Sequence, residues 1–91
     1  MKVRLRVIFS GRVQGVFFRA NTQRFASSYG VSGWVRNTNE GDVEALFEGE
    51  EEAVNAVIKK CQYDQPYARV DKVQVFEEEP RGDLRGFNIR Y

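Results

Sequence analysis

The chain contains no histidine, only one cysteine and no long run of apolar residues. Without histidine it can form no Ser-His or Cys-His nucleophile pair, no histidine general base and no histidine-ligated zinc site. The single cysteine, Cys61, excludes a disulfide within the chain and agrees with a reducing compartment. No segment has the pattern of a membrane span or a secretory signal. We therefore expect a cytoplasmic protein that does not bind a membrane.

Charge is almost balanced, with 14 Lys and Arg against 13 Asp and Glu and a net charge of +1. This balance gives no general attraction to nucleic acid. The stretch from Lys2 to Arg24 nevertheless holds six basic residues and no acidic one, so an anion is expected to bind in this part of the chain. A length of 91 residues predicts a single domain, residues 1–91, and we expect it to work as a monomer.

The hydrophobic pattern alternates between the periods of strands and helices. We expect strands at 3–9, 33–38, 43–47 and 70–76, helices at 18–29 and from 50 to about 61, and a short final strand at 87–91. This βαββαβ order predicts a ferredoxin-like α+β fold, with both helices on one face of an antiparallel sheet. The expected strand order is 4-1-3-2, with the short fifth strand at an edge. In this topology the first two strands run parallel, so their C-terminal ends lie at the same end of the sheet. This brings the loop 11–17 close to Asn37.

The loop 11–17 joins the first strand to the first helix and is a candidate anion site. Gly11 and Gly15 can adopt positive φ and expose consecutive backbone N–H groups, which form an anion-binding nest. A tight turn that simply needs two glycines is the alternative. The backbone candidates for this contact are Gly11, Arg12, Val13, Gln14, Gly15, Val16 and Phe17.

Arg19 lies in the first turn of the expected helix, where the helix dipole disfavours a cation by about 0.3–1 kcal/mol. A bound anion would remove that conflict, and a guanidinium can hold two phosphate oxygens at once. The alternative is an ordinary solvated arginine on the surface. Arg12 is a weaker candidate, because an arginine in a loop can simply point into water.

Asn37 shares a strand face with the apolar Val35 and precedes the turn residues 38–42. One role is to start that turn, as asparagine often does. The other is to accept a hydrogen bond from a water through its amide oxygen while its NH₂ group donates to a phosphate. Thr38 is expected either to orient the loop or Asn37, or to be an ordinary strand residue.

Two segments resemble the signatures of the acylphosphatase family. Residues 11–19 read G-R-V-Q-G-V-F-F-R and are similar to the signature G-x-V-Q-G-V-x-F-R. Residues 33–43 read G-W-V-R-N-T-N-E-G-D-V and resemble the signature G-W-V-x-N-x-x-x-G-x-V. Residues 86–91 also resemble the closing strand of the family, so the resemblance covers essentially the whole chain.

The resemblance implies a ferredoxin-like enzyme that hydrolyses the carboxyl–phosphate bond of acyl phosphates and releases inorganic phosphate. It implies that the backbone amides of loop 11–17 hold the phosphate, that Arg19 binds it and that Asn37 orients the attacking water. It implies no metal and no other cofactor. The leaving carboxylate has a conjugate acid of pKa about 4, so it departs without a general acid and the missing histidines are no obstacle.

Two other functions fit the same fold: an RNA-binding module and an anion sensor without turnover. RNA-recognition modules carry aromatic residues on the third strand, whereas residues 43–48 read V-E-A-L-F-E and are acidic. We therefore expect no nucleic-acid partner. A sensor would bind an acyl phosphate and leave it intact.

Overall fold

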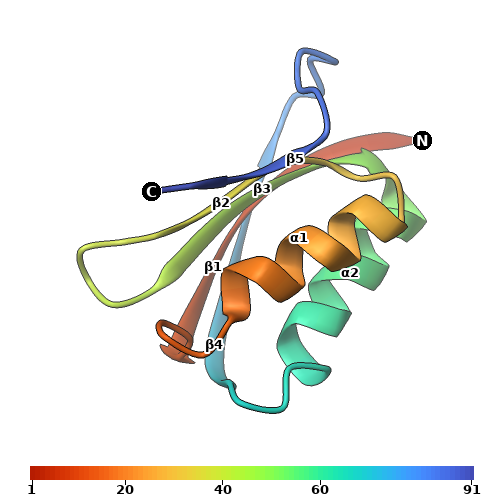
Figure 1. Ribbon diagram of the computed structural model, residues 1–91. Coiled ribbons are helices and arrows are strands. Elements are labelled where there is room, and N and C mark those ends of the chain that lie inside the picture. The colour runs from red at the N-terminus through yellow and green to blue at the C-terminus, as the bar shows by residue number, and fades with distance from the viewer.

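The computed structural model describes the whole chain, residues 1–91, as one sheet with two helices (Figure 1). In chain order the elements are β1 (Lys2–Arg12), α1 (Phe18–Ser28), β2 (Ser32–Asn37), β3 (Val43–Glu50), α2 (Glu51–Tyr63), β4 (Arg69–Glu78) and β5 (Phe87–Arg90). The order expected from the sequence is confirmed. β1, β3 and β4 are longer than expected, because pairing with neighbouring strands extends them beyond the apolar alternation. Neither helix has the length and apolar character needed to cross a bilayer.

The strands form one five-stranded sheet in the order β4-β1-β3-β2-β5. This agrees with the expected order, including the edge position of the short fifth strand. The sheet is mixed rather than wholly antiparallel, which corrects the prediction: β5 joins the outer edge of β2 in a parallel direction. Both helices cover one face of the sheet, and the other face is left open (Figure 1).

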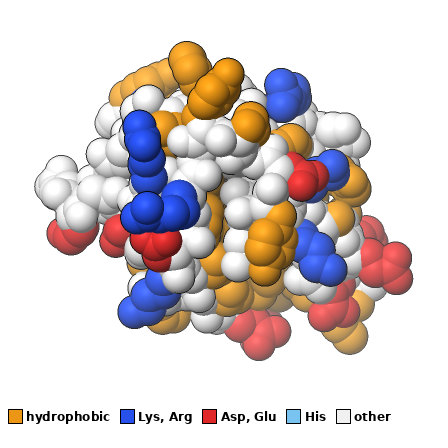
Figure 2. Space-filling model, turned by 90° about the horizontal axis from the view of Figure 1, so that it is seen from below, with side chains coloured by type: hydrophobic (Ala, Val, Ile, Leu, Met, Phe, Trp, Pro, Cys, Tyr) orange, Lys and Arg blue, Asp and Glu red, His pale blue; other side chains and the backbone are white.

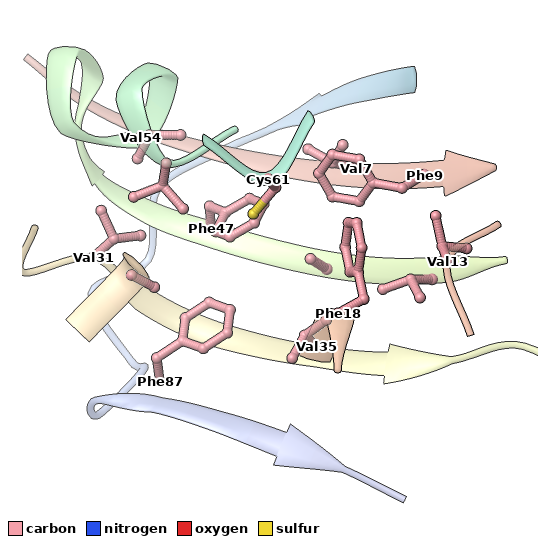
Figure 3. Packing of buried hydrophobic residues seen from close by; sticks show 14 of the residues in the cluster. Val7, Phe9, Val13, Phe18, Val31, Val35, Phe47, Val54, Cys61 and Phe87 are labelled. Atoms are coloured by element: carbon pink, nitrogen blue, oxygen red, sulfur yellow. The ribbon is translucent and has the colours of Figure 1, made fainter. Parts of the chain in front are cut away.

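The core lies between the helices and the sheet, and an aromatic contact within it holds the start of α1 (Figure 3). Phe9, near the end of β1, packs against Phe18 in the first turn of α1, with ring centroids 5.2 Å apart. Both side chains are almost fully buried. Aromatic pairs of this kind add to the free energy of burying each ring. The contact therefore holds the start of α1 beside the end of β1, with the loop between them at the surface.

Cys61 is buried on the inner face of α2, as expected for a small core residue (Figure 3). Burial raises the pKa of its thiol to about 12, and a hydrogen bond to the Thr22 hydroxyl at 3.4 Å only partly opposes this. A thiol with such a pKa is protonated at neutral pH, in agreement with a core role for Cys61.

The open face of the sheet carries ion pairs between neighbouring strands. Arg4 of β1 contacts Glu48 of β3 at 2.8 Å, and Arg6 contacts Glu44 at 3.0 Å. Burial alone would raise the pKa of the Glu48 carboxyl. Hydrogen bonds from the backbone N–H of Gly82 and from Arg4 outweigh this and hold that pKa below its ordinary value. The charges on this face are thus largely neutralised within the protein.

Candidate active site

The loop between β1 and α1 is shorter than the sequence suggests. Gly11 and Arg12 belong to β1, where they pair with Val70 and Arg69 of β4 after a register shift. Gly11 has φ 129°, and a Cβ atom there would lie 2.3 Å from the Arg69 carbonyl oxygen, so only glycine fits. The segment free of strand pairing is therefore residues 13–17, which contains Gly15 at φ 72°.

This loop leads into a helix whose N-terminus has no side-chain cap. The N-cap position is Phe17, which makes no capping hydrogen bond, and the first turn of α1 contains no acidic residue. In α2, by contrast, Glu51 and Glu52 lie in the first turn. Uncapped N–H groups at a helix start carry partial positive charge and are suited to bind an anion.

A cavity of about 280 Å³ opens beside this helix start. It is lined by Val13, Gly15, Phe17, Phe18, Arg19, Ala20, Asn37, Ile89 and Tyr91. The loop, the start of α1 and the ends of β2 and β5 all lie on the left side of the ribbon view (Figure 1). The view from below shows basic and hydrophobic side chains together on one face, with most acidic side chains toward its edges (Figure 2). The expected convergence of the loop, Arg19 and Asn37 is thus present in the fold.

Arg19 reaches this cavity from the first turn of α1 and pairs with no carboxylate. Its Nη1 donates to the carbonyl oxygen of Arg90 at 3.5 Å, and its guanidinium lies 4.8 Å from the centroid of the Tyr91 ring. Both contacts are with residues at the end of β5. A long hydrogen bond to a neutral carbonyl oxygen and a cation–π contact leave the positive charge of Arg19 without a counter-ion.

Asn37 is the last residue of β2 and lies on the same side of the strand as the buried Val35. Its Oδ1 atom is buried and has no hydrogen-bond partner. Nearly all buried polar atoms in native proteins have a partner, so an unpaired acceptor calls for an explanation. A ligand or a water bound in the cavity is the explanation that fits its position.

Gln14 and Thr38 connect the loop to the turn that follows Asn37. The Gln14 amide donates to the carbonyl oxygens of Thr38, at 2.9 Å, and Asp42, at 2.8 Å. The Thr38 hydroxyl accepts from the N–H of Asp42 at 3.1 Å. The hydroxyl therefore closes the β2–β3 turn, and through Gln14 this turn holds the loop in place.

Two predicted loop residues line a different cavity. Arg12 and Val16 lie on the other side of the loop, in a cavity of about 400 Å³ that also contacts Tyr67. Ile89 and Tyr91 line the cavity with Arg19, although no sequence pattern predicted them there. The register of β5 explains their position, since Ile89 lies opposite Val35 and the strand continues toward Asn37. No group of three or more Asp, Glu, Cys or His residues is arranged to hold a metal ion.

Comparison with known proteins identifies the family of the chain. The acylphosphatase family model matches residues 5–89. The chain belongs to the acylphosphatase family. The two signature segments lie within the matched region, as do all the residues that line the cavity except Tyr91.

Individual acylphosphatases resemble the chain over most of its length. The acylphosphatase of Rubrobacter xylanophilus is 54% identical over 87 residues, which cover 96% of this chain and 79% of that protein. The acylphosphatase of Geobacter sulfurreducens is 48% identical over 91 residues, which cover 100% of both chains. The crystal structure of the Bacillus subtilis acylphosphatase superposes with a TM-score of 0.93 at 35% identity, covering 98% of this chain and 99% of that one.

Proposed function

We propose that this protein hydrolyses acyl phosphates to a carboxylate and inorganic phosphate, with Arg19 and Asn37 as its catalytic residues. The observation that carries the proposal is that both face one cavity at the uncapped start of α1. Arg19 there has no counter-ion, and the Asn37 amide oxygen is buried without a partner. A tetrahedral anion with an attacking water would satisfy both groups.

The phosphate is held by the loop backbone and by Arg19. The N–H groups of residues 13–17 and of the first turn of α1 donate to its oxygens, and the guanidinium of Arg19 binds two of them. For this contact Arg19 leaves the Arg90 carbonyl and the face of Tyr91, both weaker partners than a dianion. Gly11 and Arg12 contribute by fixing the start of the loop to β4, because their backbone groups lie in the sheet.

The Asn37 amide oxygen accepts a hydrogen bond from the attacking water and directs the water oxygen at phosphorus. The new P–O bond forms as the bond between phosphorus and the carboxyl oxygen breaks, and the electron pair leaves with the carboxylate. The water proton passes to a phosphate oxygen, whose second pKa is about 6. No histidine, metal or cofactor takes part in these steps.

Two effects would accelerate the reaction: alignment of the water with the substrate, and stabilisation of the charge that develops on the phosphate. Holding water and substrate in line is worth up to about 7–11 kcal/mol, and one preorganised donor at the developing charge is worth about 3–4 kcal/mol. The fold supplies both, since Phe18 anchors the start of α1 in the core and Gln14 fixes the loop to the turn after Asn37.

An RNA-binding role is not favoured. RNA-recognition modules bind bases on the open face of the sheet through aromatic residues. On this face Arg4 and Arg6 are already paired with Glu48 and Glu44, so these two arginines offer no free charge to a nucleic-acid backbone. We propose a cytoplasmic monomer, built from one domain over residues 1–91, whose partners are small acyl phosphates and inorganic phosphate.

The test is turnover of benzoyl phosphate, followed by the loss of its absorbance. We expect hydrolysis well above the spontaneous rate, with inorganic phosphate as a competitive inhibitor. In ¹⁸O-labelled water the label should enter phosphate, because the attack is at phosphorus. Binding without turnover would indicate an anion sensor, and label in benzoate would indicate attack at the carbonyl carbon instead.

A further inference from the structure

Phe17 combines two features that folding alone does not favour. It is the only non-glycine residue with positive φ, at φ 63° and ψ 20°, and its side chain is 73% exposed. A non-glycine residue is strained in this region, and such strain is concentrated at functional sites. An exposed ring recovers little of that cost by burial. The backbone therefore holds a large apolar side chain in solvent at the edge of the candidate active site.

Phe17 also separates the two cavities beside the loop. On one side lies the cavity with Arg19 and Asn37, and on the other a cavity of about 400 Å³ with Arg12, Pro66 and Tyr67. The rings of Phe17 and Tyr67 meet edge to face, with centroids 6.5 Å apart. The Tyr67 side chain is 69% exposed, so this aromatic pair lies open to a ligand.

The strand order places this pair opposite Asn37. In the sheet, β1 has β4 on one side and β3, then β2, on the other. Asn37 ends β2, whereas Tyr67 lies just before β4. The loop that follows β1 is thus between them. In-line displacement at phosphorus places water and leaving group on opposite sides, so a water held by Asn37 directs the carboxylate toward Tyr67.

We propose that Phe17 and Tyr67 form the subsite for the acyl group of the substrate and set its preference for an aromatic over a small acyl group. This inference rests on the proposed hydrolysis. An aromatic acyl group can pack against both rings, and the guanidinium of Arg12 in the same cavity can stack on its face. An acetyl group has no ring to pack against these side chains.

The experiment compares benzoyl phosphate with acetyl phosphate in the unmodified protein and in three variants, Tyr67→Ala, Tyr63→Ala and Tyr91→Ala. Each kcat/KM is divided by the spontaneous hydrolysis rate of the same substrate. In the unmodified protein we expect this value to be at least tenfold higher for benzoyl phosphate. Tyr67→Ala should lower the benzoyl-to-acetyl ratio about fivefold. Tyr63 is the matched control, because it is 71% exposed and lies on α2 away from both cavities, so Tyr63→Ala should leave the ratio unchanged.

Three results would overturn the subsite. The ratio in Tyr67→Ala could stay within twofold of the unmodified protein, or it could fall equally in Tyr63→Ala. It could also fall only in Tyr91→Ala, which would place the acyl group beside β5. In all three cases the unmodified protein still hydrolyses acyl phosphates, so the proposed function stands. Absence of turnover with either substrate would overturn the proposed function, and the subsite with it.

Discussion

The side-chain amide of Gln14 donates to the carbonyl oxygen of Thr38 at 2.9 Å and so joins the anion-binding loop to the turn that follows Asn37. The loop with Arg19 and the strand end with Asn37 come from segments far apart in the sequence. Their relative position therefore depends on this contact as well as on the core beneath. A second bond from the same amide, to Asp42 at 2.8 Å, makes the connection bidentate.

Gln14→Leu removes both bonds while keeping a side chain of similar size. We expect the free energy of unfolding to fall by about 1–3 kcal/mol, as for two lost hydrogen bonds. We also expect kcat/KM for benzoyl phosphate to fall about tenfold or more, because the loop loses its fixed position. Gln23→Leu is the matched control, since the Gln23 amide donates to the Phe87 carbonyl at 2.9 Å, away from the loop. It should lose stability but little activity, and equal losses of activity in both variants would contradict a positioning role for Gln14.

Arg19→Ala removes the only guanidinium in the cavity with Asn37. We expect kcat/KM to fall by about 10²–10³-fold or more, and inhibition by inorganic phosphate to weaken strongly. Arg19→Lys should recover little, because an ammonium group lacks the planar fork with which a guanidinium binds two oxygens. Arg24→Ala, an exposed arginine on the same helix, should be close to the unmodified protein. Near-normal kcat/KM in Arg19→Ala would exclude its proposed role.

Asn37→Ala removes the group that we propose to orient water. We expect kcat to fall about 10²–10³-fold while the inhibition constant of inorganic phosphate changes less than about threefold. Asn39→Ala, at an exposed position of the same turn, serves as the control and should leave kcat unchanged. Comparable losses in turnover and in phosphate affinity would make Asn37 a binding residue instead.

Phe17→Gly relieves the left-handed backbone conformation at the N-cap of α1. The relief is worth about 1–3 kcal/mol, and the added freedom of the unfolded chain offsets about 0.4–1 kcal/mol of it. Urea unfolding should therefore show a variant about 1 kcal/mol more stable than the unmodified protein. Phe17→Ala keeps a Cβ atom in the same conformation and should show no such gain. A large loss of stability in Phe17→Gly would mean that the phenyl ring itself holds the loop.

Glu48 links stability to pH, because hydrogen bonds hold its pKa below the ordinary value in the folded protein. A carboxyl whose pKa is lowered in the folded protein stabilises the fold at any pH above its pKa in the unfolded chain, which is about 4.3. This stabilisation is lost as the pH falls through the pKa of the folded protein. Glu48→Gln should therefore be less stable at pH 7, by about 1.5–3 kcal/mol, and should lose less stability on acidification. Glu52→Gln, at an exposed position of α2, is the control. Parallel pH profiles for Glu48→Gln and the unmodified protein would contradict the linkage.

The sequence was sufficient to predict the element order and the proximity of the β1–α1 loop to Asn37, since both depend on hydrophobic periodicity and on topology. It was not sufficient to predict that Gly11 and Arg12 pair with β4, because a strand bulge depends on the neighbouring strand rather than on local pattern. The same is true of Tyr91. Its place beside Arg19 follows from the parallel register of β5 on β2, for which the residues of β5 carry no local signal.

The aromatic pair of Phe17 and Tyr67 illustrates the same limit. One residue lies in the loop after β1 and the other just before β4, and only the fold brings their rings to 6.5 Å. The positive φ of Phe17 had no signal in the sequence either, because phenylalanine is not a residue that favours this region. Local patterns thus identify the loop, while the sheet determines what surrounds it.

The central claim is that the loop amides, Arg19 and Asn37 bind one tetrahedral anion. A crystal structure of the protein with bound phosphate tests it most directly. We predict phosphate oxygens within hydrogen-bonding distance of the Arg19 guanidinium and of the N–H groups of residues 13–17, with the Asn37 amide facing the ion. Phosphate bound elsewhere, with Arg19 still stacked on Tyr91, would contradict the account.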